Sequence, residues 1–281
     1  MRVVIDPHAK ACPGVRRAIR MTEESLDAGE TIYTIGELIH NGREVARLEK
    51  MGLRRVSREE LDQLCSEGKG KGARFLIRSH GESVDVVEQV TASGFVPLDA
   101  TCRIVKRSQE LVQAHTKGRG QVVIAGKKKH AEVTGLMGCA RGRGRVVSSP
   151  EEAEAVVPAD NYLLIAQTTI GIELFEDVKK KLKKINNNLK VVDTTCKFLG
   201  RRRKEVLDLA RNHDGVVLVG GIHSSNCRML YETMKGVNRN IWKTEDPRSL
   251  KLSEGIETLA ITGGASTPEW QLQDAKAFLE N

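Results

Sequence analysis

Aromatic residues are scarce in this sequence, at 4% of 281 residues. The net charge of +8 favours anionic partners, but so few stacking platforms argue against a nucleic acid. No apolar run approaches the ~20 residues of a membrane-spanning helix. The opening MRVVID lacks the basic start and apolar core of a secretory signal peptide. We therefore expect a cytoplasmic protein with neither a nucleic-acid nor a membrane partner.

Cysteine is also infrequent, and its spacing excludes the common short metal motifs. None of the six cysteines forms a CxxC pair, so neither a zinc ribbon nor a ferredoxin-like site is expected. Three of them recur at long, nearly equal intervals instead: Cys12, Cys102 and Cys196 are 90 and 94 residues apart. The other three share no repeated position and are expected to be ordinary thiols.

The segments around the three recurring cysteines resemble one another. Two of the cysteines end similar phrases, Asp-Ala-Thr-Cys102 and Asp-Thr-Thr-Cys196. Polar residues follow apolar runs at matching distances beyond each cysteine, first His40, His130 and Ser224, then His80, Thr168 and Ser266. Such a period outranks chain length as a guide to architecture and predicts three repeated domains.

Each repeat alternates short apolar runs with amphipathic stretches, which is typical of βα units and parallel sheets. Strands are expected near 31–36, 53–57, 74–79, 121–125, 145–148, 161–166, 215–220, 240–243 and 258–262. The predicted α/β domains are 13–98, 99–192 and 193–281, after a segment 1–12 that holds the first strand and the first cysteine. Gly29, Gly118 and Gly215 precede the first strand of each repeat and predict left-handed helix ends.

The expected strands at 95–101 and 189–195 lead into Cys102 and Cys196, whereas the third repeat ends without such a strand. A matching strand at 2–7 leads into Cys12 instead. We therefore expect the N-terminal strand to pair with the third domain, which would close a ring of three α/β units.

Each recurring cysteine is expected at a strand-to-helix junction, where the positive end of the helix favours a thiolate. Three thiolates about a pseudo-threefold axis suit an iron–sulfur cube in which a fourth iron stays open to substrate. Two alternatives are three buried structural thiols and a zinc ion held by three cysteines.

Polar side chains are expected around this open iron. The histidines and hydroxyls that follow the strands, together with Ser225 and Asn226, form a suitable site for an anion such as phosphate. Glu132, two residues beyond His130, is the carboxylate nearest to them in sequence. A low-dielectric pocket would raise its pKa and suit it to deliver a proton.

Eight short motifs resemble the signatures of 4-hydroxy-3-methylbut-2-enyl diphosphate reductases, the LytB-type iron–sulfur enzymes. They are ACPGVRRAI, ELIHNGREV, IRSHGES, LDATCRIV, HAEVTGLMG, AQTT, SSN and GGAS, and they run from residue 1 to about 270. The resemblance implies a trefoil of three pseudo-threefold-related α/β domains around a 4Fe–4S cluster. It also implies reductive removal of an allylic hydroxyl, which yields isopentenyl and dimethylallyl diphosphates with electrons from a ferredoxin or flavodoxin.

The same resemblance implies a role for each motif residue. Cys12, Cys102 and Cys196 would hold the cluster. Glu132 would be the proton source, with His130 and Thr168 orienting the hydroxyl end of the substrate. The diphosphate would be held by His40, His80, Ser224, Ser225, Asn226 and Ser266.

One stretch departs from the family pattern. A polar Thr-Thr-Asn-Arg-Gln segment usually follows the third cysteine, and this chain has Lys-Phe-Leu-Gly-Arg-Arg-Arg there, with Leu199 in place of a threonine. A related reductase acting on a different allylic or activated alcohol therefore stays open. A non-catalytic iron–sulfur or zinc redox sensor is a further alternative, against which Glu132 and Thr168 argue because a sensor needs no proton relay.

Overall fold

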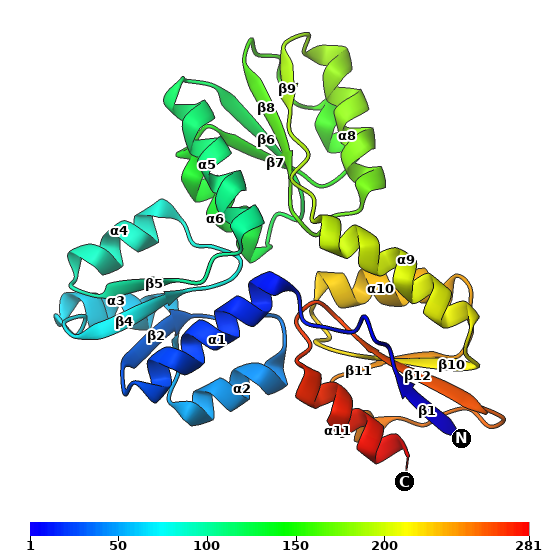
Figure 1. The fold of residues 1–281 in the computed structure, drawn as a ribbon. Coiled ribbons are helices and arrows are strands. Elements are labelled where there is room, and N and C mark those ends of the chain that lie inside the picture. Colours follow the sequence, from blue (N-terminus) through cyan, green and yellow to red (C-terminus); the bar gives the residue numbers. More distant parts are fainter. Residues whose placement is uncertain (281) are drawn as a thin grey trace. The chain divides into compact units, whose positions relative to one another are not determined.

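The computed structural model describes residues 1–280, in which helices and strands alternate along the chain (Figure 1). The strands form three four-stranded sheets, and the pairings between strands are parallel. The expected α/β class with parallel sheets is confirmed.

The first sheet along the chain has the order β3-β2-β4-β5. Its strands are β2 (Thr31–Ile35), β3 (Arg54–Val56), β4 (Ala73–Ile77) and β5 (Val96–Asp99). The helices that alternate with them in sequence are α1 (Pro13–Asp27), α2 (Gly42–Met51), α3 (Arg58–Ser66) and α4 (Val84–Ala92).

The second sheet has the order β7-β6-β8-β9. Its strands are β6 (Gln121–Ala125), β7 (Gly144–Val147), β8 (Tyr162–Ala166) and β9 (Leu189–Val191). The helices of this part of the chain are α5 (Arg103–Lys117), α6 (Ala131–Ala140), α7 (Pro150–Glu154) and α8 (Ile172–Ile185).

The third sheet has the order β1-β12-β10-β11 and takes one strand from the N-terminus. Its strands are β1 (Arg2–Ile5), β10 (Gly215–Val219), β11 (Ile241–Thr244) and β12 (Thr258–Gly263). Its helices are α9 (Lys197–Arg211), α10 (Ser225–Lys235), the short 3-10 turn η1 (Pro247–Ser249) and α11 (Glu269–Leu279).

The three sheets share one connectivity, in which the strand that leads into a recurring cysteine lies at an edge. In the third sheet that strand is β1, which pairs with β12 in a parallel register from Arg2–Thr258 to Ile5–Ile261 (Figure 1). The expected pairing of the N-terminal strand with the third repeat is therefore confirmed. In this sheet β1 occupies the edge position that β5 and β9 occupy in the other two.

The chain divides into two compact units. The first comprises Met1–Asp27, Glu37–Arg55 and the chain from Lys197 onward, and the second comprises Ala28–Gly36 and Val56–Cys196. The second and third sheets thus fall in different units. The three-domain boundaries expected from the sequence stay a prediction.

The central strands are buried on both faces, which explains their continuous apolar sequences. In β10, Val216 and Leu218 face a core shared with α9 and α10. The alternate residues Val217 and Val219 face a second core that includes Leu272 of α11. The third sheet therefore has a core on both faces, and the helices that cover it need only one apolar face.

None of the helices within residues 1–280 has the length and apolar character of a membrane span.

The expectation of left-handed glycines holds at one position of three. Gly29 has a φ of +77°, but Gly118 has a φ of −78° and Gly215 is the first residue of β10. After α5 the left-handed residue is Arg119, at a φ of +62°, whose N–H donates to the carbonyl of Thr116. The turn therefore follows Gly118 by one residue.

A buried ion pair fixes the end of β1. The Nη2 atom of Arg202 on α9 lies 2.8 Å from Oδ2 of Asp6, and the hydroxyl of Thr262 donates to the same carboxylate oxygen at 2.7 Å. Arg202 and Asp6 are only 3% and 4% exposed. The residue that follows the N-terminal strand is thus tied to β12 and to α9.

We expect Arg202→Met to lower the free energy of unfolding by roughly 3–5 kcal/mol, because Asp6 would stay buried without its cation. Urea denaturation measures the change. The neighbouring Arg201 is exposed, so Arg201→Met should change stability by less than about 0.5 kcal/mol. Adding Asp6→Asn to Arg202→Met should restore part of the loss; equal losses in the two variants would contradict a charge-based cause.

Candidate active site

The three recurring cysteines have the same backbone setting. The N–H groups of Cys12, Cys102 and Cys196 donate to the carbonyl of the second residue beyond a strand, at 2.9, 3.0 and 2.9 Å. The acceptors are Ala265 after β12, Ser79 after β4 and Thr168 after β8. Each cysteine is therefore held beside the segment in which the sequence had placed a polar site residue.

An aspartate at the end of each edge strand shapes the turn into the cysteine. Asp6, Asp99 and Asp193 each accept a hydrogen bond from the N–H two residues further on, at 2.8, 3.0 and 2.8 Å. The sequence had shown this for two repeats as the shared Asp-x-Thr-Cys phrase. The first repeat has the same aspartate with three more residues before its cysteine.

Each cysteine directly precedes a helix, namely α1, α5 and α9. All three are partly exposed and none is in a disulfide. The Sγ atom of Cys12 accepts a hydrogen bond from the N–H of Val15 at 3.4 Å. Backbone N–H groups at a helix start stabilise a thiolate, which is the form that binds iron or zinc.

The donor set fits a cluster with three protein ligands. Each thiolate of a cluster binds a different iron, so its ligands do not converge on one point as the ligands of a single ion do. Among residues 1–280 no group of three or more histidine, cysteine or acidic side chains could hold a metal ion.

Glu132 and Thr168 form a buried hydrogen-bonded pair in the second unit. One carboxylate oxygen of Glu132 accepts from the N–H of Thr168 at 2.7 Å, and the other accepts from its hydroxyl at 2.8 Å. Glu132 is 1% exposed and Thr168 is 8% exposed. Burial raises the pKa of the Glu132 carboxyl to about 7, although both hydrogen bonds act in the opposite direction.

His130 caps α6 with its side chain. Its Nδ1 accepts the N–H of Glu132 at 3.2 Å, so in the neutral imidazole Nε2 carries the proton. Its ring meets the ring of His80 edge to face, with 5.7 Å between centroids. The structure thus brings His80, His130, Glu132 and Thr168 together in one unit.

His80 lies in a closely packed loop. A Cβ at Gly81, which has a φ of +78°, would lie 2.6 Å from the Nε2 of Gln109. That Nε2 donates to the carbonyl of Glu82 at 3.0 Å, and Glu82 accepts from Arg78 Nε at 2.6 Å. These contacts on both sides of His80 fix the direction of its loop.

Five of the predicted anion-binding residues lie in the first unit. The hydroxyl of Ser266 donates to the carbonyl of His40 at 3.0 Å, and Ser224 caps α10 by accepting the N–H of Cys227 at 3.3 Å. Asn226 follows in the first turn of α10 and is 6% exposed, yet its side-chain oxygen and nitrogen have no hydrogen-bond partner within residues 1–280. A buried amide without partners is costly, so this one is suited to a ligand. Ser225 is half-buried beside it.

Two further residues, Asn41 and Gly221, hold the His40 loop, and neither was expected from the sequence to have a role. Asn41 donates to the carbonyl of Ser266 at 3.1 Å and exchanges two 2.9 Å hydrogen bonds with Gln271. Gly221 lies so close that a Cβ would be 2.4 Å from the carbonyl oxygen of His40. Because Asn41 directly follows His40, its place in the sequence could have indicated this role.

The fold and site together define an α/β protein with a threefold-repeated thiol position and a buried carboxyl–hydroxyl pair. The family model described as "LytB protein" matches residues 3–280. The chain belongs to this family, which confirms the resemblance drawn from the eight motifs.

Curated relatives match over the whole chain. A 4-hydroxy-3-methylbut-2-enyl diphosphate reductase of Phocaeicola vulgatus is 32% identical, with 100% of this chain and 99% of the relative covered. The reductase of the same name from Aquifex aeolicus is 33% identical, with 99% and 96% covered. The family is thus one of oxidoreductases, as expected.

Two solved structures are similar to this chain over its whole length. The structure of (E)-4-hydroxy-3-methyl-but-2-enyl diphosphate reductase, the terminal enzyme of the non-mevalonate pathway, matches with a TM-score of 0.74 and 33% identity, covering 100% of this chain and 99% of that one. A structure of the E-1-hydroxy-2-methyl-but-2-enyl-4-diphosphate reductase from Plasmodium falciparum has a TM-score of 0.85 at 24% identity, covering 100% and 88%. The second match supports the fold.

The raised pKa of Glu132 predicts a pH-dependent difference in stability between the wild type and Glu132→Gln. As pH rises from 4.5 to about 7, the unfolded chain loses this proton before the folded one, so the wild type should lose on the order of 3 kcal/mol relative to the variant. Above pH 7 the difference should stay constant. Urea unfolding across this range measures it, with the exposed Glu254→Gln as control; a pH-independent difference would contradict the assignment.

Proposed function

We propose that this protein reduces 4-hydroxy-3-methylbut-2-enyl diphosphate to isopentenyl and dimethylallyl diphosphates. The reaction breaks the allylic C–O bond, consumes two electrons and two protons, and releases water. The observation that carries the proposal is the buried Glu132–Thr168 pair, in a chain that matches reductases of this name over its whole length. A protonatable carboxyl with a neighbouring hydroxyl supplies what the departing oxygen needs.

Cys12, Cys102 and Cys196 would hold a 4Fe–4S cluster with one open iron. Their shared backbone setting and their positions before helices support this assignment. When bound, the cluster supplies a Lewis-acidic iron and accepts and passes on single electrons.

Glu132 would donate the proton that turns the leaving hydroxyl into water. A pKa of about 7 leaves a substantial fraction of this carboxyl protonated near neutral pH. The Thr168 hydroxyl, 2.8 Å from the carboxylate, would orient the hydroxyl end of the substrate together with His130, whose Nε2 carries the proton in the neutral tautomer.

The diphosphate would be bound by His40, His80, Ser224, Ser225, Asn226 and Ser266. The buried Asn226 amide supports this role because an anion and its hydration water would satisfy a donor and an acceptor that the chain leaves unpaired. The N-terminus of α10, where Ser224, Ser225 and Asn226 lie, adds backbone N–H groups and a positive helix end.

A ferredoxin- or flavodoxin-type protein would deliver the electrons one at a time. Six cysteines without a disulfide are compatible with a reducing cytoplasmic setting, in which such donors and labile clusters persist.

A second candidate is the same chemistry on another allylic or activated alcohol. Leu199, 7% exposed in the first turn of α9, supports it because an apolar side chain stands three residues beyond Cys196 where the family usually has threonine. The anion-binding residues favour a phosphorylated substrate in either case.

The decisive assay uses anaerobically reconstituted protein, the allylic diphosphate and a chemical reductant. We expect about four irons per chain and formation of five-carbon diphosphates, with kcat falling as pH rises through about 7 because Glu132 loses its proton. Glu132→Gln should lower kcat by at least ~100-fold with an unchanged cluster spectrum. Four irons without turnover would favour the second substrate class, and zinc in place of iron would refute both.

Asn226→Leu should separate binding from stability. We expect a rise in KM of about tenfold or more without loss of folding stability, because the variant removes two buried polar atoms that lack partners in the free protein. Asn238 is the matched control: its amide donates to the carbonyls of Ala210 and His213 at 2.8 and 2.9 Å, so Asn238→Leu should destabilise the fold. An unchanged KM in Asn226→Leu would remove this residue from the substrate site.

A further inference from the structure

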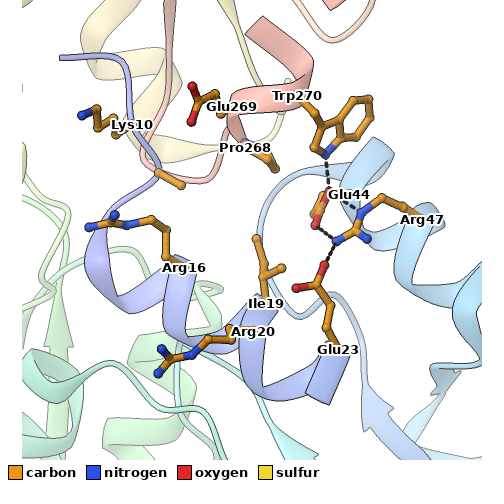
Figure 2. Close-up of a pocket in the computed structure, with 11 residues that line it drawn as sticks. Lys10, Arg16, Ile19, Arg20, Glu23, Glu44, Arg47, Pro268, Glu269 and Trp270 are labelled. Carbon is orange, nitrogen blue, oxygen red and sulfur yellow. Dashed lines mark hydrogen bonds and ion pairs between the residues drawn. The ribbon is translucent and has the colours of Figure 1, made fainter. Parts of the chain in front are cut away.

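A cavity of about 360 Å³ opens in the first unit among residues of α1, α2 and the start of α11 (Figure 2). Its lining includes Lys10 and Ala11, on the segment just before Cys12. None of the anion-binding residues proposed above contributes to it. The cavity is therefore separate from the proposed diphosphate site, although it adjoins a proposed cluster ligand.

On one side of the cavity the charged side chains pair with one another. Arg47 lies 2.6 Å from the buried carboxylate of Glu44 and 2.5 Å from Glu23, and the indole N–H of Trp270 donates to Glu44 at 2.8 Å (Figure 2). These groups satisfy one another and join three helices. This side of the cavity therefore holds the three helices together and offers little unpaired charge to a binding partner.

The opposite side carries exposed cations. Lys10, Arg16 and Arg20 are exposed, and Figure 2 draws them away from the Arg47 cluster. In the described chain neither Lys10 nor Arg16 forms an ion pair, and the partner of Arg20 is Glu24, at 3.6 Å. Glu269 also lines the cavity. Its single negative charge is smaller than the three positive charges of Lys10, Arg16 and Arg20, so this basic rim (Lys10, Arg16 and Arg20) keeps a net positive charge.

The basic rim surrounds the start of α1, immediately beyond Cys12. Lys10 is two residues before the cysteine, and the N–H of Arg16 donates to the Cys12 carbonyl at 3.0 Å. A partner bound to these side chains would lie within a few residues of a thiolate that the proposed function assigns to the cluster. Electron transfer between proteins needs this proximity.

We infer that the basic rim is the docking surface for a small acidic one-electron donor protein of the ferredoxin type. This inference rests on the proposed function. Long exposed cations without buried polar anchors are poorly suited to enclose a small anion, whose sites hold a few polar groups in fixed positions. They are well suited to a transient redox encounter, which buries little area and depends on complementary charge for fast association.

The test uses reconstituted holoprotein and a purified acidic ferredoxin. Arg16→Gln/Arg20→Gln is compared with Arg239→Gln/Lys251→Gln, which removes the same charge from exposed positions before β11 and β12, at the other end of the strands. Ferredoxin affinity is measured by calorimetry at low and at 0.3 M salt. Turnover is measured separately with ferredoxin and with a chemical reductant.

We expect the rim variant to weaken ferredoxin binding about tenfold at low salt, to lose most of the salt dependence of the wild type, and to keep its rate with the chemical reductant. The control pair should behave as the wild type in all three measurements. Equal ferredoxin affinity in the two double variants, or salt-independent binding by the wild type, would overturn the inference. A protein that fails with the chemical reductant in every form would instead refute the proposed reaction, while the calorimetry still decides whether the rim binds ferredoxin.

Discussion

The parallel pairing of β1 with β12 is the constraint on which the N-terminal arm depends. It joins Arg2–Ile5 to strand residues more than 250 positions later, and it supplies the edge strand that the third sheet would otherwise lack. The buried Asp6–Arg202 pair and the hydrogen bond from Cys12 to Ala265 extend that attachment to the cysteine. Without this strand pairing, the segment before Cys12 would lose its attachment to the third sheet.

Burial has opposite consequences for Glu132 of the second unit and Asn226 of the first unit. For Glu132, removal from water raises the pKa and keeps a proton available, and the cost is limited by two hydrogen bonds from Thr168. For Asn226, burial leaves two polar atoms unpaired, which lowers the stability of the free protein and rewards a ligand that satisfies them. In the proposed function, the first group is the proton donor and the second binds the diphosphate.

Much of the architecture could be predicted from the sequence because it is repeated. The spacing of Cys12, Cys102 and Cys196 indicated which strands are equivalent, and the missing third copy indicated where β1 pairs. These are regularities of period and topology, which one sequence displays directly.

Other features depend on side-chain packing that a period does not encode. Arg202 belongs to a run of three arginines that reads as a solvated surface, yet its guanidinium is buried against Asp6. Nothing in the sequence distinguishes the unpaired amide of Asn226 from the satisfied amide of Asn41. The expectation at Gly118 was wrong because the left-handed residue is Arg119, one position later.

The discontinuity of the first unit also sets an order of events during synthesis. Most of the second unit, Val56–Cys196, is continuous and can fold as it leaves the ribosome, whereas β1 must wait for β12. The 67 residues from Cys196 to the end of β12 take on the order of 3–13 s to translate at typical rates. Throughout that interval Cys12 belongs to an arm without its partner strand, while Cys102 and Cys196 can already occupy their final backbone positions. Cys12 is therefore the last of the three recurring cysteines to reach its final backbone position.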